Sequence, residues 1–552
     1  MSEAKPIYKH WIETVVDDLV KRGDVPTVLS TAKTPSGPIH IGISRELVYC
    51  SVFEKLLEER GVETDFIFTV DDMDSIKKFP PGVPEAFMKH TEYIGKPMVD
   101  VPCPYGDCEN WGKHYAQELI DTFNDFGLFP RVIWAHKLYM TKEMKDAIRI
   151  SLKNVETIRQ ILKDIMEPTL SGSQLEAFRR ELPTWYPCLV VCEQCGLLKP
   201  TVVTGYDPNR DTVSYTCSAC GYSGEMSISQ GRVKLRWRVD WAAKWAIFRV
   251  SCEPAGKDHC VKGGAYDTGE AICQKVFGWK GPYRVPYEWF LLGVHAMKTH
   301  KGISFTWPEW LAVAPPEVLR YMVLREDPRK HISFEPERIP QLIDEFERAE
   351  QIYFDHAKAS NSIEERNLKL IYPFCIPNHP PEALPLRLPY RFAVILSQLD
   401  PLLGKEGVRK KAITVTKKLY KKVELTETEI LAIEKTLERA RYWVDHYAPD
   451  EMKVVITPTV SQEIIQKLSE RQRLGIKLLV ERFASKEWTE QELQNEIFNI
   501  GNQTGIKTKI FEAVYLIFLG KPFGPRLAPF LLSLDQNFVI QRLKQAAEPE
   551  AA

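Results

Sequence analysis

The chain has 552 residues, of which 44% are hydrophobic and 27% are charged. This length is enough for three or four domains, and the composition is that of a soluble globular protein. With 73 basic and 74 acidic side chains the net charge is −1, so any nucleic-acid surface must be local. The N-terminus lacks the apolar core of a signal peptide, and no segment approaches a membrane span. We therefore expect a cytoplasmic protein.

The first 100 residues predict alternating strands and helices. Residues 25–31 form an apolar run that indicates a buried strand, and a loop rich in proline and glycine breaks it. A helix ending at Gly61 follows, and residues 62–70 predict a second strand. The apolar face of this helix consists of Leu47, Val48, Val52, Phe53, Leu56 and Leu57. Strand, helix and strand in this order are typical of a parallel, doubly wound sheet.

The loop Ser36–Gly42 between the strand and the helix carries the most informative motif. A glycine-containing loop that leads into a helix holds anions such as phosphate through its backbone N–H groups. His40 in this loop can donate to a phosphoryl group whose charge grows in a transition state. An ordinary turn with a surface histidine is the alternative for such a short motif. The second predicted strand ends in aspartates that either contact substrate or form a polar turn, namely Asp71, Asp72 and Asp74.

Four of the twelve cysteines form two C-x-x-C pairs with 21 residues between them. This spacing predicts one tetrahedral, structural Zn²⁺ site. Its ligands are Cys192, Cys195, Cys217 and Cys220. Cys103 and Cys108, with His114 nearby, are a second candidate site, for which unligated cysteines are the favoured alternative.

The run VKLRWRVDW, residues 233–241, predicts a buried strand whose charged side chains need partners. Either it is a core strand with charges at its rim, or it is a pocket wall where Asp240 pairs with an ammonium group between indole faces. Two glycine-containing segments follow, residues 256–259 and 263–269, and glycine permits close approach of a ligand. Asp267 is a candidate for contact with ribose hydroxyls.

After Pro308 the sequence is helical to its end. Thr-x-x-Glu capping boxes at residues 426–429 and 489–492 predict helix starts, and the proline-rich residues 373–389 predict a linker. Between residues 405 and 422, eight basic side chains stand against one acidic residue. This stripe is either a surface that contacts tRNA phosphates or a solvated helical face. Its candidate contacts are Arg409, Lys410, Lys411, Lys417 and Lys418.

Five segments, in the same order as in the family, resemble class I lysyl-tRNA synthetases of the archaeal type. They are STAKTPSGPIHIG, VKLRWRVDW, EPAGKDH, YDTG and, near the C-terminus, GPRLAPFLLSLDQNFVIQRL. The resemblance implies an α/β fold with a Rossmann-like parallel-sheet catalytic domain, a zinc-ribbon-like insertion and an all-α C-terminal domain. It implies that lysine reacts with ATP to lysyl-adenylate, with Mg²⁺ accompanying ATP, and that lysine is then transferred to tRNA(Lys). Oligomeric state is outside what it implies.

The resemblance also implies a division of the chain. The catalytic domain occupies residues 1–184 and 232–300, around a zinc-binding module at 185–231. A signature loop and helical stem-contact region at 301–372 and an anticodon-binding domain at 373–552 follow.

Site residues follow from the resemblance as well. For ATP they are Gly37, His40, Gly42, Asp267, Met297 and Lys301, with His40, Lys298 and Lys301 taking part in catalysis. For lysine they are Thr34, Trp237, Asp240, His259 and Tyr287. Asp240 is the candidate partner of the lysine ammonium, and Trp237 and Trp241 line the pocket.

Departures from the family pattern concentrate on the ATP-binding elements. The second signature, a lysine-rich mobile loop, corresponds to residues 296–303, where Ala296 replaces the leading lysine and Ile303 the closing asparagine. Ile43 replaces a polar residue, and Ala32 replaces a glycine near the lysine pocket. The alternative is therefore a diverged paralogue with weakened, altered or lost aminoacylation that acts as a tRNA-binding or regulatory protein.

Overall fold

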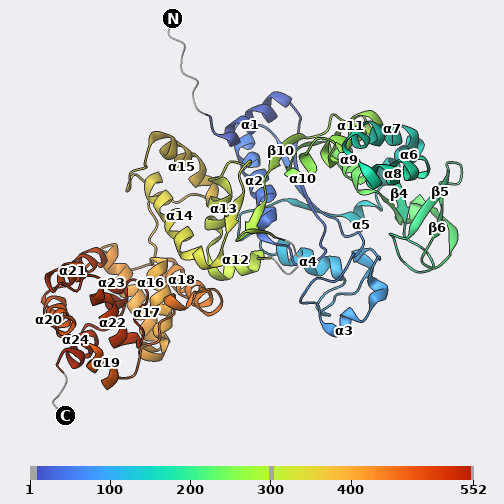
Figure 1. Ribbon diagram of the computed structural model, residues 1–552. Helices are drawn as coiled ribbons and strands as arrows, with labels where there is room; N and C mark the ends of the chain where they lie inside the picture. Colours follow the sequence, from blue (N-terminus) through green and yellow to red (C-terminus); the bar gives the residue numbers. More distant parts are fainter. Residues whose placement is uncertain (1–8, 298–303, 549–552) are drawn as a thin grey trace, which may run out of the picture. The chain divides into compact units, whose positions relative to one another are not determined.

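The structure is a computed structural model that describes residues 9–297 and 304–548 (Figure 1). The chain divides into two compact units. The first comprises the residues up to 310 with 315–335 and 355–380, and the second comprises 311–314, 336–354 and the residues from 381 onwards. Within the described ranges, no helix has both the length and the apolar character needed to cross a membrane.

A five-stranded parallel sheet forms the centre of the first unit. Across the sheet the strands are β10 (Tyr283–Tyr287), β9 (Val250–Gly256), β1 (Thr27–Lys33), β2 (Thr64–Val70) and β3 (Arg131–Trp134). Helix α2 (Ser44–Glu58) packs on β1, β2 and β9 (Figure 1). The expected strand–helix–strand unit and the α/β class are therefore confirmed, with both strands starting two residues later than predicted.

The expected strand over residues 233–241 is wrong beyond its first three residues. Strand β8 covers only Val233–Leu235, and helix α9 (Trp237–Ile247) follows after one residue. The physical reason lies in the spacing of Trp237, Trp241 and Trp245, which recur every four residues and so share one helix face. Apolar and charged residues alternate over residues 233–241, and this alternation favours a strand over the helical spacing of the tryptophans.

Short strands surround the paired cysteines. β4 (Cys188–Val190) pairs antiparallel with β8, and a three-stranded antiparallel sheet consists of β5 (Thr201–Asp207), β6 (Thr212–Cys217) and β7 (Ser223–Ser227). The three longer helices between β3 and β4 precede this region in the chain: α6 (Lys142–Lys153), α7 (Val155–Met166) and α8 (Gly172–Glu181).

The remaining helices of the first unit lie at its N-terminus, in the connections between its strands and after β10. They are α1 (Trp11–Arg22), α3 (Glu85–Met88), α4 (Trp111–Ile120), α5 (Ala135–Leu138), α10 (Lys257–Cys260), α11 (Ala265–Phe277), α13 (Pro316–Leu324) and α15 (Ser362–Cys375). Three further short strands follow β10: β11 (Phe290–Leu292), β12 (His295–Ala296) and β13 (Ile332–Phe334). Strand β13 interrupts the expected helical stretch because it pairs in parallel with β11.

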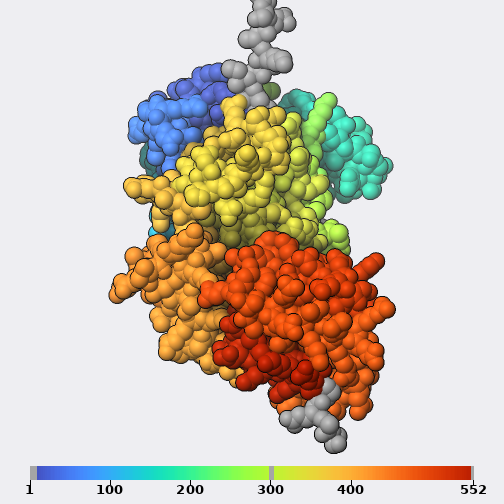
Figure 2. Space-filling model, turned by 90° about the vertical axis from the view of Figure 1, so that its left-hand side faces the viewer, coloured from blue at the N-terminus to red at the C-terminus, as the bar shows by residue number. Residues whose placement is uncertain are grey.

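The described residues of the second unit after 381 form helices and loops without a strand, and the space-filling view shows this C-terminal part as a closely packed body in orange and red (Figure 2). Its helices are α14 (Ile339–Tyr353), α16 (Tyr390–Leu396), α17 (Asp400–Leu419), α18 (Glu427–His446), α19 (Gln462–Lys467), α20 (Glu470–Ser485), α21 (Glu490–Gln503), α22 (Lys509–Leu519), α23 (Leu527–Ser533) and α24 (Gln536–Ala547). Helix α12 (Trp307–Val313) precedes them in the chain.

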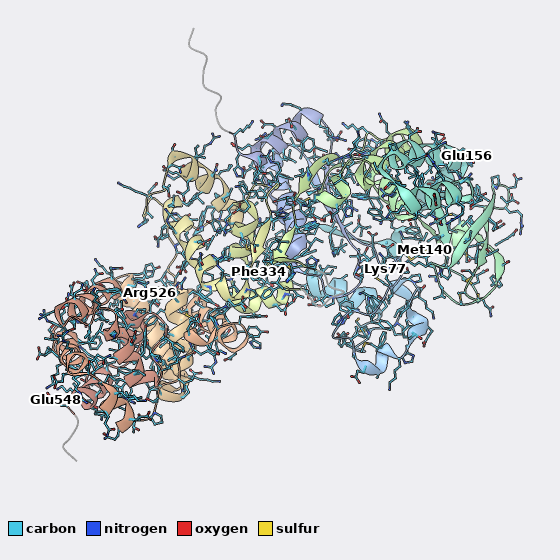
Figure 3. The ribbon with its side chains drawn as sticks, viewed as in Figure 1. Lys77, Met140, Glu156, Phe334, Arg526 and Glu548 are labelled. Atoms are coloured by element: carbon cyan, nitrogen blue, oxygen red, sulfur yellow. The ribbon has the colours of Figure 1, made fainter. Side chains whose placement is uncertain are left out.

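Local sequence signals explain where several of these helices begin. Thr426 and Thr489 form the expected capping boxes with Glu429 and Glu492. Arg526 (Figure 3) then joins α23 to α21 through an ion pair with Glu490 at 2.9 Å. The predicted linker begins later than expected, because α15 continues through its proline to Cys375.

Candidate active site

The loop between β1 and α2 places His40 directly before a short 3₁₀ turn, η1 (Ile41–Ile43). Its Nδ1 atom accepts a hydrogen bond from the backbone N–H of Gly42 at 3.1 Å, which assigns the ring proton to Nε2. Burial, with the ammonium of Lys33 nearby, lowers the pKa of His40 to about 3. The imidazole is therefore neutral near pH 7 and offers one N–H donor.

A carboxylate lies next to this loop, in the first turn of α2. Thr31 on β1 and Tyr287 at the end of β10 each donate a hydroxyl hydrogen bond to Glu46, one to each of its oxygens. Loss of hydration raises the pKa of Glu46, although these two donors and Lys33 oppose the shift. Tyr287, a predicted lysine-pocket residue, thus comes together with a carboxylate that the sequence analysis did not include.

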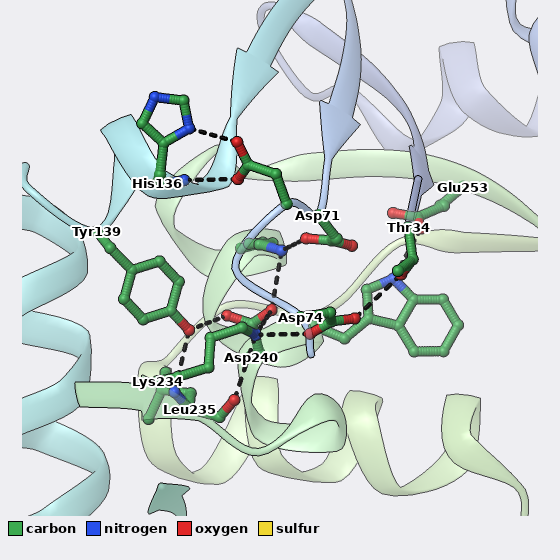
Figure 4. Close-up of polar contacts among 12 residues, drawn as sticks. Thr34, Asp71, Asp74, His136, Tyr139, Lys234, Leu235, Asp240 and Glu253 are labelled. Carbon is green, nitrogen blue, oxygen red and sulfur yellow. Dashed lines mark hydrogen bonds and ion pairs between the residues drawn. The ribbon is translucent and has the colours of Figure 1, made fainter. Parts of the chain in front are cut away.

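Thr34, the first residue after β1, contacts the carboxyl end of β2. Its hydroxyl donates to Asp74 Oδ2 at 3.0 Å, and Asp74 Oδ1 lies 3.5 Å from the ammonium of Lys234 on β8 (Figure 4). One of the aspartates after the second strand therefore holds a predicted pocket residue directly. Its side chain is 33% exposed, so it forms the outer end of the buried network that follows.

Asp240 on α9 lies at the centre of that network (Figure 4). Its Oδ2 accepts from Lys234 at 3.0 Å and from Lys244 at 2.8 Å, its Oδ1 accepts from the hydroxyl of Tyr139 at 2.5 Å, and Lys244 also pairs with Asp71. Burial alone would raise the pKa of Asp240, but the two ammonium groups bring it below its ordinary range. The predicted partner of a substrate ammonium thus already has two protein partners.

Aromatic side chains of α9 stand beside α10. The rings of Trp237 and Trp241 are stacked with centroids 5.7 Å apart, and His259 lies 5.3 Å from the first and 5.8 Å from the second. These three residues were predicted for the lysine pocket, and the structure brings them together. Trp237 is 45% exposed, so the wall is open on its side.

Behind this wall lies a second carboxylate, which was not predicted as a site residue. The indole N–H groups of Trp241 and Trp245 donate to the two oxygens of Glu253 on β9, at 2.7 and 2.8 Å. Burial raises the pKa of Glu253 to about 7, although both indole donors oppose the shift. Glu253 thus fixes two rings of the wall, and its charge state changes near neutral pH.

The predicted ATP-binding residues lie in different surroundings. Asp267 on α11 accepts from the backbone N–H of Gly263 at 2.8 Å and pairs with Arg284 at 2.8 Å, so each of its oxygens already has one partner. Gly37 and Met297 are buried. The two predicted lysines of the second signature, Lys298 and Lys301, lie outside the described residues.

The four paired cysteines come together between β4 and β7. Cys192 Sγ lies 3.7 Å from Cys220 Sγ, and Cys195 Sγ lies 3.7 Å from Cys217 Sγ. Four Zn–S bonds of about 2.3 Å in a tetrahedron place sulfurs about 3.7 Å apart, so this donor set fits a metal of that kind. Burial would raise the pKa of Cys217, but backbone N–H groups and neighbouring thiols lower it to about 7. One thiol is therefore readily available as a thiolate.

A second cluster holds the two other spaced cysteines. Cys103 Sγ lies 2.9 Å from Asp107 Oδ1 and 3.7 Å from His114 Nδ1, and one ligand atom from each of these residues and Cys108 lies within 4.8 Å of the others. Hydrogen bonds from Cys103 and His114 lower the pKa of Asp107. Two sulfurs, one imidazole and one carboxylate are also a donor set that can hold a metal ion.

Comparison with known proteins identifies the family of this chain. A family model described as tRNA synthetases class I (K) matches residues 9–373. The chain belongs to this family. Its relatives include lysine–tRNA ligases from Methanocaldococcus jannaschii, 34% identical over 97% of this chain and 99% of that protein, and from Archaeoglobus fulgidus, 32% identical over 97% and 100%. Among solved structures, a glutamate tRNA ligase from Elizabethkingia meningosepticum is 13% identical over 95% of this chain and 100% of that one, with a TM-score of 0.37.

In this class I (K) chain the basic stripe lies on α17, and part of it is engaged internally. Arg409 pairs with Glu434 at 2.5 Å, and Lys411 donates to the carbonyl of Leu534 at 3.1 Å. Lys418 contacts Glu487, whereas Lys410 is 74% exposed and lies 4.0 Å from Glu406. Among the predicted contacts, the ammonium groups of Lys410 and Lys417 have no ion pair shorter than 4.0 Å within the described residues.

The two carboxylates that were not predicted, Glu46 and Glu253, differ in whether the sequence of this class I (K) chain carries a signal for them. Glu46 precedes Tyr49, Cys50 and Phe53 by three, four and seven residues, and these three are fully buried. A charge on the inward face of a predicted helix was therefore a readable signal. Glu253 gave no such signal, because its indole partners come from a helix that the sequence analysis took for a strand.

Proposed function

We propose that this chain is a lysine–tRNA ligase of the cytoplasm that activates lysine with ATP and transfers it to tRNA(Lys). The observation that carries the proposal is one short loop–helix segment that offers two complementary groups. His40 presents a neutral N–H donor, and six residues later Glu46 presents a carboxylate held by two hydroxyl donors. A phosphate and an ammonium group are the ligands that such a pair selects. Family membership supports lysine and ATP as their sources.

In the first reaction the lysine carboxylate attacks the α-phosphorus of ATP. A P–O bond to lysine forms, the bond to the β-phosphate bridge breaks, and pyrophosphate leaves with its electron pair. Charge grows on the non-bridging phosphoryl oxygens, where the Nε2–H of His40 donates. Mg²⁺ accompanying ATP would supply positive charge to the leaving pyrophosphate. No protein nucleophile takes part, so the protein contributes positioning and charge.

In the second reaction a terminal ribose hydroxyl of tRNA attacks the lysyl carbonyl. An ester bond forms, the bond between the carbonyl carbon and the phosphate oxygen breaks, AMP leaves with its electron pair, and the hydroxyl proton is released to solvent. Lys298 and Lys301 of the second signature retain their proposed roles beside the ATP phosphates by resemblance. Asp267 and Met297 likewise remain proposals for the adenosine end.

For the lysine side chain we propose Glu46 in place of Asp240. Glu46 has hydroxyl donors but no cation within ion-pair distance among the described residues, whereas Asp240 is shared by two lysines. A carboxylate with open acceptor capacity gains more from a substrate ammonium than one already paired. Trp237, Trp241 and His259 then line the aliphatic part of lysine.

We propose that the four-cysteine cluster holds a structural Zn²⁺, because four thiolates leave no open position for chemistry. The cluster of Cys103, Asp107, Cys108 and His114 is proposed as a second metal site on the strength of its converging donors. For the second unit we propose tRNA binding, with Lys410 and Lys417 as the phosphate contacts on α17.

Lysine-dependent ATP–pyrophosphate exchange tests the proposed function. The purified chain should catalyse exchange with L-lysine, and His40→Ala should lower the rate by about 10²–10³ because one transition-state donor is lost. This variant also excludes a contaminating enzyme. Failure of lysine to stimulate exchange by a folded, metal-loaded protein would overturn the proposal, and stimulation by a different amino acid would redefine its substrate.

A further inference from the structure

One of the three aspartates that follow β2 has a partner outside the network described above. Asp71 and Asp74 contact the two lysines that pair with Asp240. Asp72, which is 1% exposed, contacts His136 of α5 instead. The reactions proposed above make no use of this carboxylate–imidazole pair.

The carboxylate of Asp72 fixes both the backbone and the ring of His136. Its Oδ1 accepts from the backbone N–H of His136 at 2.9 Å, and its Oδ2 accepts from the ring at Nδ1. The ring proton is therefore on Nδ1, and Nε2 keeps a lone pair that accepts hydrogen bonds. Within the described residues Nε2 has no partner, and the side chain is 32% exposed. In Figure 4 the ring of His136 points away from the network around Asp240. The pair thus presents an oriented acceptor that the protein itself does not use.

An indole ring and a cation lie beside this imidazole. Trp134, the last residue of β3, has its ring centroid 6.1 Å from that of His136. The ammonium of Lys113 on α4 lies 5.2 Å from the centroid of the indole ring. Both side chains are partly exposed, and Lys113 forms no ion pair with any described residue. We call Lys113, Trp134 and His136 the β3 surface.

The β3 surface adjoins the loop between β1 and α2. Lys33, Val70 and Trp134 form one row across the last residues of β1, β2 and β3. Two strand spacings of about 4.8 Å therefore separate the ends of β1 and β3. From α4, Trp111 donates its indole N–H to the carbonyl of Pro35, just before the loop, at 3.1 Å. The same edge of the sheet thus carries the β3 surface and the loop to which we assign the ATP phosphates.

We propose that the β3 surface binds the single-stranded 3′ end of tRNA(Lys). This inference rests on the proposed function for the identity of the RNA. The nucleotide that receives lysine must reach the lysyl carbonyl, so its strand approaches this edge of the sheet. Nε2 of His136 accepts from a ribose 2′-hydroxyl, Lys113 attracts a phosphate, and Trp134 stacks on a base. Asp72 is then a positioning residue, because it acts through the imidazole.

Filter binding of two tRNA(Lys) transcripts to the full chain tests the proposal. One transcript is intact, and the other lacks its last three nucleotides. The wild type should bind the intact transcript at least about tenfold more tightly, because stacking of the last bases is lost on trimming. His136→Asn, whose amide can still donate to Asp72, should lower the affinity for the intact transcript by about fivefold. Lys113→Met, which keeps the apolar stem and removes the charge, should act in the same direction. Both variants should bind the trimmed transcript within about twofold of the wild type.

A third transcript isolates the hydroxyl contact. It is intact but carries deoxyribose in its last three nucleotides. The wild type should bind it about fivefold less tightly than the all-ribose transcript, because Nε2 of His136 loses its donor. His136→Asn should bind these two transcripts equally, whereas Lys113→Met should still distinguish them. His356→Asn, which changes an exposed histidine after α14, is the matched control and should behave as the wild type.

Equal losses of affinity for the intact and the trimmed transcript in both variants would overturn the proposal, because the residues would then act on folding or on another part of the RNA. A wild type that binds the intact and the trimmed transcript equally would also overturn it. Thermal unfolding verifies that each variant is folded. Failure of the proposed function gives a different result. If the predicted binding differences are found but lysine supports no ATP–pyrophosphate exchange, the β3 surface stands and the ligase assignment falls.

Discussion

The Nδ1 atom of His40 accepts the backbone N–H of Gly42, which turns the opposite ring nitrogen into the donor of the loop. The glycine is required for this arrangement by space rather than by backbone conformation. A Cβ atom at position 42 would lie 2.7 Å from both Cε1 and Nδ1 of the imidazole. Any side chain there pushes the ring out of its place.

Gly42→Ala should therefore reduce catalysis without unfolding the protein. We expect lysine-dependent exchange to fall by about 10²-fold or more, because the displaced imidazole no longer donates to the phosphoryl oxygens. Exchange kinetics and thermal unfolding measure the two effects separately. Gly205→Ala, where a Cβ meets only the side chain of Ser214 at 4.0 Å, is the control. An active Gly42→Ala protein would contradict the assigned ring orientation.

Replacing Asp240 should affect stability first. Asp240→Asn leaves the ammonium groups of Lys234 and Lys244 inside the protein with a weaker partner, and breaking a buried ion pair costs about 3–5 kcal/mol. Urea unfolding should show that loss. Glu46→Gln should keep most of its stability and lose lysine affinity instead. A stable Asp240→Asn protein that fails to bind lysine would return the ammonium site to Asp240.

Local patterns in the sequence predicted those features that depend on residues close together in the chain. The loop of His40, the capping boxes and the paired cysteines each consist of a few neighbouring residues whose chemistry dictates one geometry. The prediction for the segment that begins at Trp237 was wrong because its first residues fit the periodicity of a strand as well as that of a helix. Tertiary packing selects the helix. Period alone does not separate such short runs.

The interaction partners of charged residues could not be predicted from the sequence for a different reason. Asp240 was expected to pair with the ammonium of the substrate, whereas in the structure two protein lysines pair with it, and one of them follows it by four residues on the same helix. Glu46 and Tyr287 are 241 positions apart and meet only because β10 and α2 adjoin the same sheet. Sequence separation of that size carries no local signal.

Glu253 predicts a particular pH dependence of stability. Its folded pKa of about 7 lies above the ordinary value of 4.5, so the folded state holds the proton more tightly than the unfolded state. Its contribution to stability is thus complete below about pH 4.5 and is lost as the pH rises through 7. Between pH 5 and pH 8 the free energy of unfolding should fall by about 3 kcal/mol more in the wild type than in Glu253→Gln.

Urea unfolding of both proteins at the two pH values measures this difference. The comparison with the variant is needed because Glu54 and Glu347 also have pKa values raised to about 7 by burial. Parallel pH profiles of the two proteins would show that the indole donors hold Glu253 ionised throughout.

Metal removal should act on the cysteine cluster. Cys217→Ser should lower the zinc content by one equivalent, measured by elemental analysis, and lower the thermal midpoint, because metal binding supplies folding energy. Cys273→Ser, which changes a buried cysteine outside both clusters, should leave the zinc content unchanged. Zinc content equal to the wild type in Cys217→Ser would remove this cysteine from the ligand set.

Lysine replacements on α17 distinguish the two interpretations of the basic stripe. If α17 contacts tRNA phosphates, Lys410→Ala and Lys417→Ala should each weaken binding of a tRNA(Lys) transcript and reduce the slope of log affinity against log salt by about 1. Filter binding at several salt concentrations gives both quantities. Lys453→Ala, which removes a lysine paired with Asp450 outside α17, is the control. Because Arg409 forms an ion pair with Glu434, replacing Arg409 should change the salt slope less than replacing Lys410 does. Unchanged slopes for both lysine variants would mean that the stripe is a solvated helical face.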